Sequence, residues 1–360
     1  MLALGNAVSS SRTGLVQLVL LCGLWLMWGG WQRVWLRNLL LAVLLIYTTA
    51  MFAAPFAAGL DMTSHAALLR MGNDAPCSSR LVLWSNVLHL IGQKPWLGWG
   101  WGNLDYAHFI TLYNEPRFCD ILDNAHNLPL HLAVELGVPA AVGGCGAFAV
   151  WVTKQKPWLE RDPGRQLAWS VLAVILLHSL LEYPLWYGPF MVAFVLCVLV
   201  LRPTPDVPKE AEKSVKKQLN WPLARILRAQ TAIILIAFTG YAAWDYHRVS
   251  QIYIQPEARD AAYRDNTLEK ASQSWLFADQ ARFAALLTTP LTRANAQQTF
   301  ASASQLLHYS PEPRVVEKLI ESAVMLNRDA EALAYLARYR AAFAKEHAAW
   351  AKANATPLQN

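Results

Sequence analysis

The sequence predicts an all-α protein, a polytopic bundle of about six transmembrane helices with a long outer loop and a helical C-terminal domain. Of the 360 residues, 55% belong to the hydrophobic set and only 16% are charged, whereas about a quarter of a typical soluble domain is charged. The mean hydropathy is positive, at +0.22. This composition excludes a disordered chain, a small disulfide scaffold and a conventional cytosolic enzyme.

Six apolar runs have close to the roughly 20 residues that cross the hydrocarbon core of a bilayer as a helix. Two lie in an N-terminal region, residues 1–58, and three lie in residues 128–201. The stretch 167–201 is too long for one helix and is interrupted by Glu182-Tyr183-Pro184 and Gly188-Pro189, so it predicts two helices joined by a tight turn. The predicted spans are residues 15–31, 38–58, 128–152, two helices within 167–201, and 229–244.

The charge of the connecting loops predicts their side of the membrane. Lysine and arginine concentrate in residues 32–37, 153–166 and 202–228, and basic residues are enriched in cytoplasmic loops. These three loops are therefore predicted to face the cytoplasm. Loop 59–127, in which acidic residues outnumber basic ones, then lies on the outer side and contains amphipathic and re-entrant segments. The net charge of +6 is assigned to cytoplasmic loops, and no nucleic-acid partner is expected.

Residues 245–360 form a different, Ala-rich and polar region that is predicted to be a periplasmic helical domain. Apolar residues recur with helical spacing, as in Val315, Leu319 and Ile320. Residues 309–313 read as a helix start, and residues 327–329 as a turn between two antiparallel helices. This pattern is compatible with a tetratricopeptide-like hairpin or with a small helical cap, and one such unit falls below the roughly three repeats that a solenoid needs.

Four ionisable residues are predicted to meet at the outer face of the membrane: Arg12, Arg80, His126 and Glu182. Each has an ordinary structural explanation taken alone. An arginine beside a membrane helix commonly reaches to the lipid headgroups, Arg80 could be a solvated loop residue, and His126 or Glu182 could cap a helix. Their convergence on one side of the membrane instead favours a functional site.

Within the predicted span 128–152, His131 and Glu135 are four residues apart and share one helix face. Ionisable groups at membrane depth normally face the protein interior and have partners. A buried hydrogen-bonded pair is the simplest interpretation, and a metal site would need further ligands. The glycine-rich stretch at residues 98–102 follows no strand, which argues against a phosphate-binding loop and favours a re-entrant turn.

Several short motifs, in this order, resemble the C-terminal part of the bacterial O-antigen ligase/polymerase superfamily. The closest resemblance is to its protein O-oligosaccharyltransferase branch, the pilin-type glycosylation ligases. The resemblance covers about residues 9–201. The matching segments are Ser11-Arg12-Thr13, Ser79-Arg80 followed by Trp84, residues 94–100, residues 123–127 with Glu135-Leu136-Gly137, and residues 178–187.

The resemblance implies a metal-independent glycosyltransferase without a cofactor. It would sit in the bacterial inner membrane and move a glycan from undecaprenyl pyrophosphate to an acceptor hydroxyl at the periplasmic face. The acceptor would be a pilin-like protein, a lipid A core sugar or a growing O-antigen. Arg12 and Arg80 would bind the pyrophosphate as guanidinium forks, and His126 would act as general base. His131, Glu135 and Glu182 would support it.

One departure from the family and two other classes of function stay open. Family members carry further helices before the Ser-Arg-Thr motif, which help to form the lipid groove. We therefore expect this 360-residue chain, expressed alone, not to complement the loss of a full-length relative. A non-catalytic membrane-anchored envelope scaffold or a transporter fragment would also place charged groups near a membrane.

The positions of the cysteines predict one disulfide. Cys22, Cys145 and Cys197 lie in predicted spans, where cysteine commonly serves as a small apolar residue. Cys77 and Cys119 both lie in loop 59–127, which faces the oxidising periplasm in this topology. We expect these two cysteines to pair.

Overall fold

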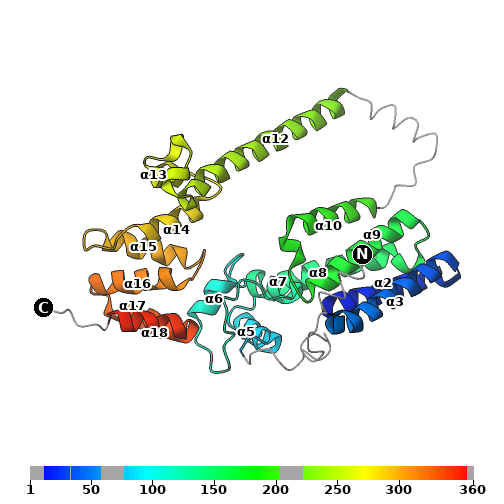
Figure 1. Ribbon diagram of the computed structural model, residues 1–360, viewed down its shortest axis with the longest axis horizontal. Coiled ribbons are helices and arrows are strands. Elements are labelled where there is room, and N and C mark those ends of the chain that lie inside the picture. Colours follow the sequence, from blue (N-terminus) through cyan, green and yellow to red (C-terminus); the bar gives the residue numbers. More distant parts are fainter. Residues whose placement is uncertain (1–11, 33, 58–76, 203–221, 355–360) are drawn as a thin grey trace. The chain divides into compact units, whose positions relative to one another are not determined.

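The computed structural model describes residues 12–32, 34–57, 77–202 and 222–354, and within these ranges the chain is helical, without strands. Contacts between Cα atoms divide it into two compact units (Figure 1). The first comprises Met1–His108 with Tyr113–Pro203, and the second comprises Thr204–Asn360 with the short segment Phe109–Leu112. The predicted all-α class is confirmed.

The first two predicted spans are helices with slightly different bounds. Helix α2 covers Arg12–Met27 and α3 covers Val34–Ala57, and a short 3-10 turn, Gly30–Gln32, lies between them. Tyr47 of α3 is buried against Leu15 and Leu18 of α2, so the two helices pack through apolar side chains.

Loop 59–127 contains two helices in its described part, α5 at Arg80–Gln93 and α6 at Leu104–Ile110. Helix α5 begins at Ser79, whose hydroxyl accepts a hydrogen bond from the backbone N–H of Val82 at 3.3 Å. Its apolar face joins a core with α6 and α7. The buried members include Leu83, Val87, Leu90, Leu104, Leu122 and Val134.

The prediction of one helix over residues 128–152 is wrong, because the chain breaks at Gly137 into α7, Leu128–Leu136, and α8, Val138–Gln155. Gly137 has φ of +91°, a conformation that side chains with a Cβ rarely adopt. A Cβ there would also collide with the carbonyl of Trp96. The sequence signal was Gly137 followed by a proline two residues later, and the length of the apolar run masked it.

Three backbone hydrogen bonds join this break to the glycine-rich stretch. The N–H groups of Trp99 and Gly100 donate to the carbonyls of Val134 and Glu135, both at 2.9 Å, and Val138 N–H donates to Pro95 at 2.8 Å. Residues 95–100 thus satisfy carbonyls at the end of α7 that a helix terminus leaves free. We call this contact the backbone clasp.

The predicted break within 167–201 is confirmed. Helix α9 covers Pro163–Ser179, a 3-10 turn η4 covers Pro184–Trp186, and α10 covers Gly188–Val200. Helices α9 and α10 pack through a core that includes Trp169, Leu172, Cys197 and Leu201.

The second unit begins with the 29-residue helix α12, Pro222–Ser250, which extends beyond the predicted residues 229–244 at both ends. Figure 1 shows the helices α14–α18 stacked side by side. The predicted helix start and turn are confirmed, because α16 begins at Pro313 and α17 at Asp329. The short helix α13, Thr267–Ser272, precedes the stack. The stacked helices are α14 Ala278–Thr288, α15 Ala296–Leu306, α16 Pro313–Met325, α17 Asp329–Ala342 and α18 Ala344–Asn354.

Across the described ranges, none of the helices combines the length and the apolar character that a membrane crossing requires. The 13-residue α10, for example, extends only about 20 Å at the α-helical rise, against ~30 Å of hydrocarbon. The structure therefore confirms the helical class but not the six predicted spans.

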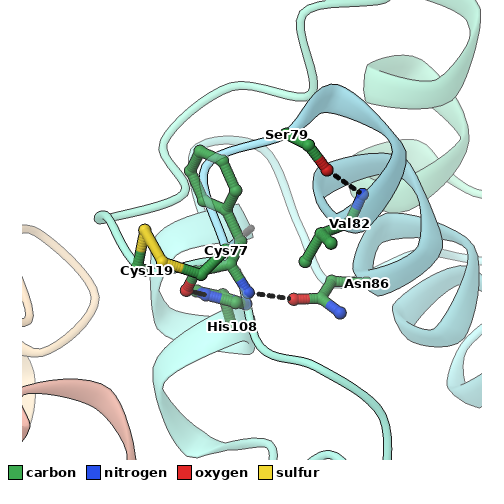
Figure 2. Close-up of a disulfide and its surroundings, with 7 residues drawn as sticks. Cys77, Ser79, Val82, Asn86, His108 and Cys119 are labelled. Carbon is green, nitrogen blue, oxygen red and sulfur yellow. Dashed lines mark hydrogen bonds between the residues drawn. A yellow bond between two sulfur atoms is a disulfide. The ribbon is translucent and has the colours of Figure 1, made fainter. Parts of the chain in front are cut away.

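Figure 2 shows the disulfide that joins Cys77 to Cys119, with Cα atoms 5.3 Å apart. It pairs the two cysteines that the sequence analysis expects to pair. The neighbouring Phe118 N–H donates to Asn86 at 2.8 Å, and the Phe118 carbonyl lies 3.3 Å from Nε2 of His108. Burial and the nearby Arg117 lower the pKa of His108 to about 3, so this imidazole is neutral and can donate to that carbonyl.

We predict that alkylation of the unfolded, unreduced chain labels the three free cysteines, and that reduction raises this to all five. Closing a loop of 42 residues stabilises a fold by about 4 kcal/mol in the chain-entropy model. Cys77→Ser should therefore lower the unfolding temperature, whereas Cys22→Ser, outside the pair, should change it little. Labelling of five thiols before reduction would contradict the assignment.

Candidate active site

The Glu182 carboxylate bridges two basic side chains that are distant in the sequence. Its Oε1 atom forms an ion pair with Nη2 of Arg80, and its Oε2 atom lies 2.8 Å from Nδ1 of His126. The side chains of Arg80, His126 and Glu182 are 42%, 27% and 34% exposed, so solvent and solutes can reach them. Three of the four residues predicted to lie on the outer face are therefore joined through Glu182, and we call them the Arg80–Glu182–His126 triad.

All three residues of the triad are held at helix ends. Arg80 is the first residue of α5. His126 lies just before α7, whose cap is Asn127. Glu182 follows the end of α9, and its backbone N–H donates to the carbonyl of His178 at 2.8 Å. Each residue therefore sits at a capped or hydrogen-bonded helix end.

Two asparagine side chains hold the backbone around His126. His126 has φ of +49°, an uncommon conformation for a residue with a Cβ. The buried Asn124 supports it by accepting a hydrogen bond from His126 N–H at 3.0 Å. Asn127 caps α7 by accepting from Leu130 N–H at 3.1 Å, and its amide donates to the carbonyl of Leu180 at 3.1 Å. These bonds connect the His126 segment directly to the turn that carries Glu182.

The contact with Glu182 decides which nitrogen of His126 carries the proton. A carboxylate only accepts, so Nδ1 must donate to Oε2 of Glu182. In the neutral ring Nε2 then bears the lone pair, and no hydrogen-bond partner for it is found among the described residues. Tyr183 packs edge-on against the imidazole, with ring centroids 4.9 Å apart, and restricts its rotation. A carboxylate that orients a histidine in this way is the arrangement of general bases in hydrolases and transferases.

His131 and Glu135 form a buried pair on α7, as the sequence analysis expects. Both side chains are 2% exposed, and His131 Nε2 lies 3.3 Å from Oε2 of Glu135. The separation is that of an ion pair, but Oε2 has no partner with hydrogen-bond geometry among the described residues. The other carboxylate oxygen accepts from Gly102 N–H at 2.9 Å, and His131 Nδ1 accepts from Ala125 N–H at 3.4 Å. The pair thus connects α7 to the glycine-rich stretch and to the residue before His126.

The structure does not test two other expectations. Arg12 is the first residue of α2, but its side chain lies outside the described part of the chain, so its predicted role stays a prediction. No group of three or more His, Cys, Asp and Glu side chains in the described ranges is arranged to hold a metal ion. The metal-independent reaction likewise stays a prediction.

Two residues near the triad were missed by the sequence analysis. Burial raises the pKa of Asp105 to about 7, and the carboxylates of Asp123 and Glu135 add to this shift. A hydrogen bond with Tyr187, together with burial, raises the pKa of Tyr183 to about 12. Asp105 follows the glycine-rich stretch, and Tyr183 follows Glu182, but neither position has a local pattern that marks it as part of a site.

Two cavities adjoin the triad. A cavity of about 260 Å³ is lined by Glu182 itself together with His178, Tyr183 and Tyr187. A larger cavity of about 470 Å³ is almost entirely apolar, and its lining includes Leu20, Leu128, Gly144, Cys145, Leu180 and Leu185. Leu180 and Leu185 flank Glu182 in the sequence, so the same turn carries the carboxylate and part of the apolar wall.

Comparison with known proteins shows two family matches and two similar curated proteins. A family described as O-antigen ligase matches residues 1–145, and one described as virulence factor membrane-bound polymerase, C-terminal, matches residues 166–357. The chain is 30% identical over 133 residues to a general O-oligosaccharyltransferase of Acinetobacter baylyi. This alignment covers 35% of this chain and 22% of that protein. It is 22% identical over 191 residues to a ComP-specific O-oligosaccharyltransferase of the same organism, covering 53% of this chain and 34% of that protein.

The chain therefore spans only 22% and 34% of the lengths of these relatives. No solved structure matches it significantly. The residues that the two family matches cover include the whole triad, with Arg80 and His126 in the first match and Glu182 in the second.

We predict that neutral His126 carries its proton on Nδ1, which nitrogen NMR of the chain labelled in histidine will show. Most free imidazoles favour the other tautomer, so the signal is distinctive, and its loss in His126→Gln will assign it. Glu182→Ala should shift the proton toward Nε2, because the acceptor at Nδ1 is gone. The exposed His89 on α5 serves as the internal control and should not respond. An Nε2–H tautomer in the unmodified chain would contradict the proposed orientation.

Proposed function

The chain belongs to the O-antigen ligase superfamily, and on that premise we propose that it transfers a glycan from undecaprenyl pyrophosphate to an acceptor hydroxyl. The reaction would take place at the periplasmic face of the bacterial inner membrane. Both relatives are O-oligosaccharyltransferases, which favours a Ser or Thr hydroxyl of a pilin-like protein as the acceptor. A lipid A core sugar and a growing O-antigen present the same hydroxyl chemistry and are the alternative acceptors.

The contact between Glu182 and His126 is the observation that carries this proposal. An acceptor hydroxyl becomes a good nucleophile when a base removes its proton. His126 Nε2 bears the lone pair in the tautomer described above, and it is within reach of solvent. In the proposed step Nε2 takes the proton, the oxygen attacks the anomeric carbon, and the bond from that carbon to the pyrophosphate oxygen breaks. Glu182 then stabilises the imidazolium that forms.

The pyrophosphate that leaves must be stabilised as its negative charge develops. Arg80 contacts Glu182 through Nη2. Its guanidinium has five N–H donors, so this contact leaves other donors available. The remaining donors can bind phosphate oxygens in the bidentate manner that lysine cannot reproduce. Arg12 is proposed for the same role from the sequence motif, and no metal or other cofactor is proposed.

The apolar cavity supports a lipid-linked donor. Its wall comes from α2, α7, α8, α9, α10 and the turn after α9, and the wall residues Leu180 and Leu185 lie on either side of Glu182 in that turn. A polyprenyl chain in the cavity would place its pyrophosphate next to Glu182 and Arg80. The proposal includes a membrane location for this reason, with lipids as the surroundings of α2, α3 and α8–α10.

We predict that His126→Ala lowers the rate of glycan transfer by about 10²–10⁴-fold, the usual contribution of a general base. The assay measures glycosylated acceptor by mass spectrometry in membranes where the chain is co-expressed with the preceding helices of a full-length relative. Arg80→Lys should also fail, because a point charge does not replace the guanidinium fork. The exposed His89→Ala on α5 is the matched control and should retain activity.

The possible outcomes separate the proposal from its alternatives. Absence of transfer by the unmodified chain, without accumulation of lipid-linked glycan in a deletion strain, would favour a scaffold or transporter. Normal transfer by His126→Ala would leave the family function intact and exclude the proposed base.

A second prediction concerns the lipid cavity, where two glycines of α8 provide a matched pair. A Cβ at Gly144 or at Gly146 meets no atom within 4 Å, but only Gly144 lines the cavity. Both glycines gain the same helix propensity when replaced by leucine. Gly144→Leu should reduce transfer by filling the cavity, with the loss appearing in KM for the lipid donor, whereas Gly146→Leu should behave like the parent. Equal effects of the two variants would exclude this cavity as the lipid site.

A further inference from the structure

Two tryptophans from separate segments stack on one another at the protein surface. The rings of Trp101, which precedes α6, and Trp186, in the turn η4, are nearly parallel, with an interplanar angle of 12° and centroids 6.0 Å apart. They remain 61% and 40% exposed. We call this pair the tryptophan shelf. So much exposed aromatic surface in one place is typical of a site that another molecule covers.

The buried side chain of His131 contacts both indoles of the shelf. The His131 ring is perpendicular to both indoles, with centroids 4.7 Å from Trp186 and 6.3 Å from Trp101. His131 is 2% exposed and is held by Ala125 N–H and by its contact with Glu135. Glu135 also accepts from Gly102 N–H, so the residue next to Trp101 is fixed as well. A shelf that is rigid before binding loses little entropy when a ligand is bound.

Two carboxylates belong to the segments that form and hold this aromatic surface. Asp105 lies in the first turn of α6, four residues after Trp101, and Asp123 lies two residues before Ala125, whose N–H donates to His131. Asp123 is exposed and therefore open to a ligand. Flat apolar faces flanked by a few hydrogen-bond acceptors match the two sides of a pyranose ring, which has an apolar C–H face and polar hydroxyl edges.

We propose that the tryptophan shelf binds a pyranose ring of the lipid-linked glycan, with the C–H face on the indoles and hydroxyls donating to Asp123 and Asp105. This proposal rests on the proposed glycan transfer. The donor, rather than the acceptor, is assigned because of the neighbouring turn. Leu185 lines the apolar cavity and the next residue, Trp186, forms the shelf, so one turn carries contacts for a lipid and for the sugar joined to it.

Lipid headgroups are the competing occupant, because tryptophan is common at membrane interfaces. Two features of the shelf argue against it. The indoles are stacked on each other and held edge-to-face by the buried imidazole of His131, whereas an interfacial anchor needs only a single ring. The carboxylate of Asp123 can also accept hydrogen bonds from sugar hydroxyls, whereas a phosphodiester group offers it no donor.

Saturation-transfer NMR on the full chain in detergent micelles tests the proposal, with methyl β-D-glucopyranoside and methyl N-acetyl-β-D-glucosaminide as probes. Stacking should saturate the axial protons H1, H3 and H5 most strongly, since they form the C–H face. Trp101→Ala and Trp186→Ala should reduce the signal at least tenfold, and Trp101→Phe should retain part of it. Trp96→Ala is the matched control, because Trp96 lies in the same loop and is 77% exposed.

Asp123→Asn provides a second variant that leaves the packing of the rings unchanged, and it should weaken the signal several-fold. Circular dichroism will identify variants that fail to fold. A saturation signal that is absent from the parent, or equal in the parent and both alanine variants, would overturn the proposal. So would a loss of vesicle binding in the alanine variants with no change in the sugar signal, because the shelf would then be a lipid anchor.

The transfer assay separates this inference from the proposed function. If the shelf binds the donor, Trp101→Ala raises KM for the donor at least fivefold while kcat changes less. Normal kinetics in the shelf variants, together with loss of transfer in His126→Ala, would exclude the shelf and keep the function. Sugar binding by the shelf in a chain whose His126→Ala variant is unimpaired would exclude the proposed base instead.

Discussion

The backbone clasp between residues 95–100 and the junction of α7 with α8 determines the geometry of the first unit. Three backbone N–H groups bond to carbonyls across this contact, at 2.8 or 2.9 Å. The close approach leaves no space for a Cβ at Gly137, where φ is +91°. Because the clasp holds the end of α7, it also positions His131 and Glu135 within that helix and Trp101 just beyond the loop. Two segments that are more than 30 residues apart in the sequence are thereby brought together by backbone hydrogen bonds, and the Glu135 side chain adds a further bond by accepting from Gly102 N–H.

Glu182 is the second feature that fixes the site. It orients the side chains of His126 and Arg80, and it adds little to the stability of the fold. Ion pairs exposed to this degree contribute little to folding. What the carboxylate does is to hold one nitrogen of His126 as a donor and to keep Arg80 alongside. The segment before α7 supports this arrangement, because Asn124 accepts a hydrogen bond from His126 N–H and the Asn127 amide donates to the carbonyl of Leu180. Asn124 and Asn127 thus hold the backbone of the 123–127 motif, while the His126 side chain contacts Glu182.

The turn from Leu180 to Tyr187 connects the parts of the site. Its first residues and Leu185 contribute to an apolar cavity, Glu182 completes the triad, and Trp186 stacks on Trp101. In the proposed transfer, the contacts with the lipid and sugar portions of a donor would be made by the same turn that carries Glu182. Enzymes use such remote contacts to hold a substrate in a reactive position.

The sequence alone determined the helical class, the break around residues 182–189, the pairing of Cys77 with Cys119 and the residues of the triad. The helical class follows from composition, and the break follows from proline and glycine signals. The cysteine pair and the triad follow from the side of the membrane on which the loop charges place those residues. The tertiary structure decided the break at Gly137, the bridging role of Glu182 and the stacking of Trp101 on Trp186. These features depend on backbone and side-chain contacts between segments that are tens of residues apart. Hydrophobic periodicity reports which residues avoid water, but it does not report which distant atoms they meet.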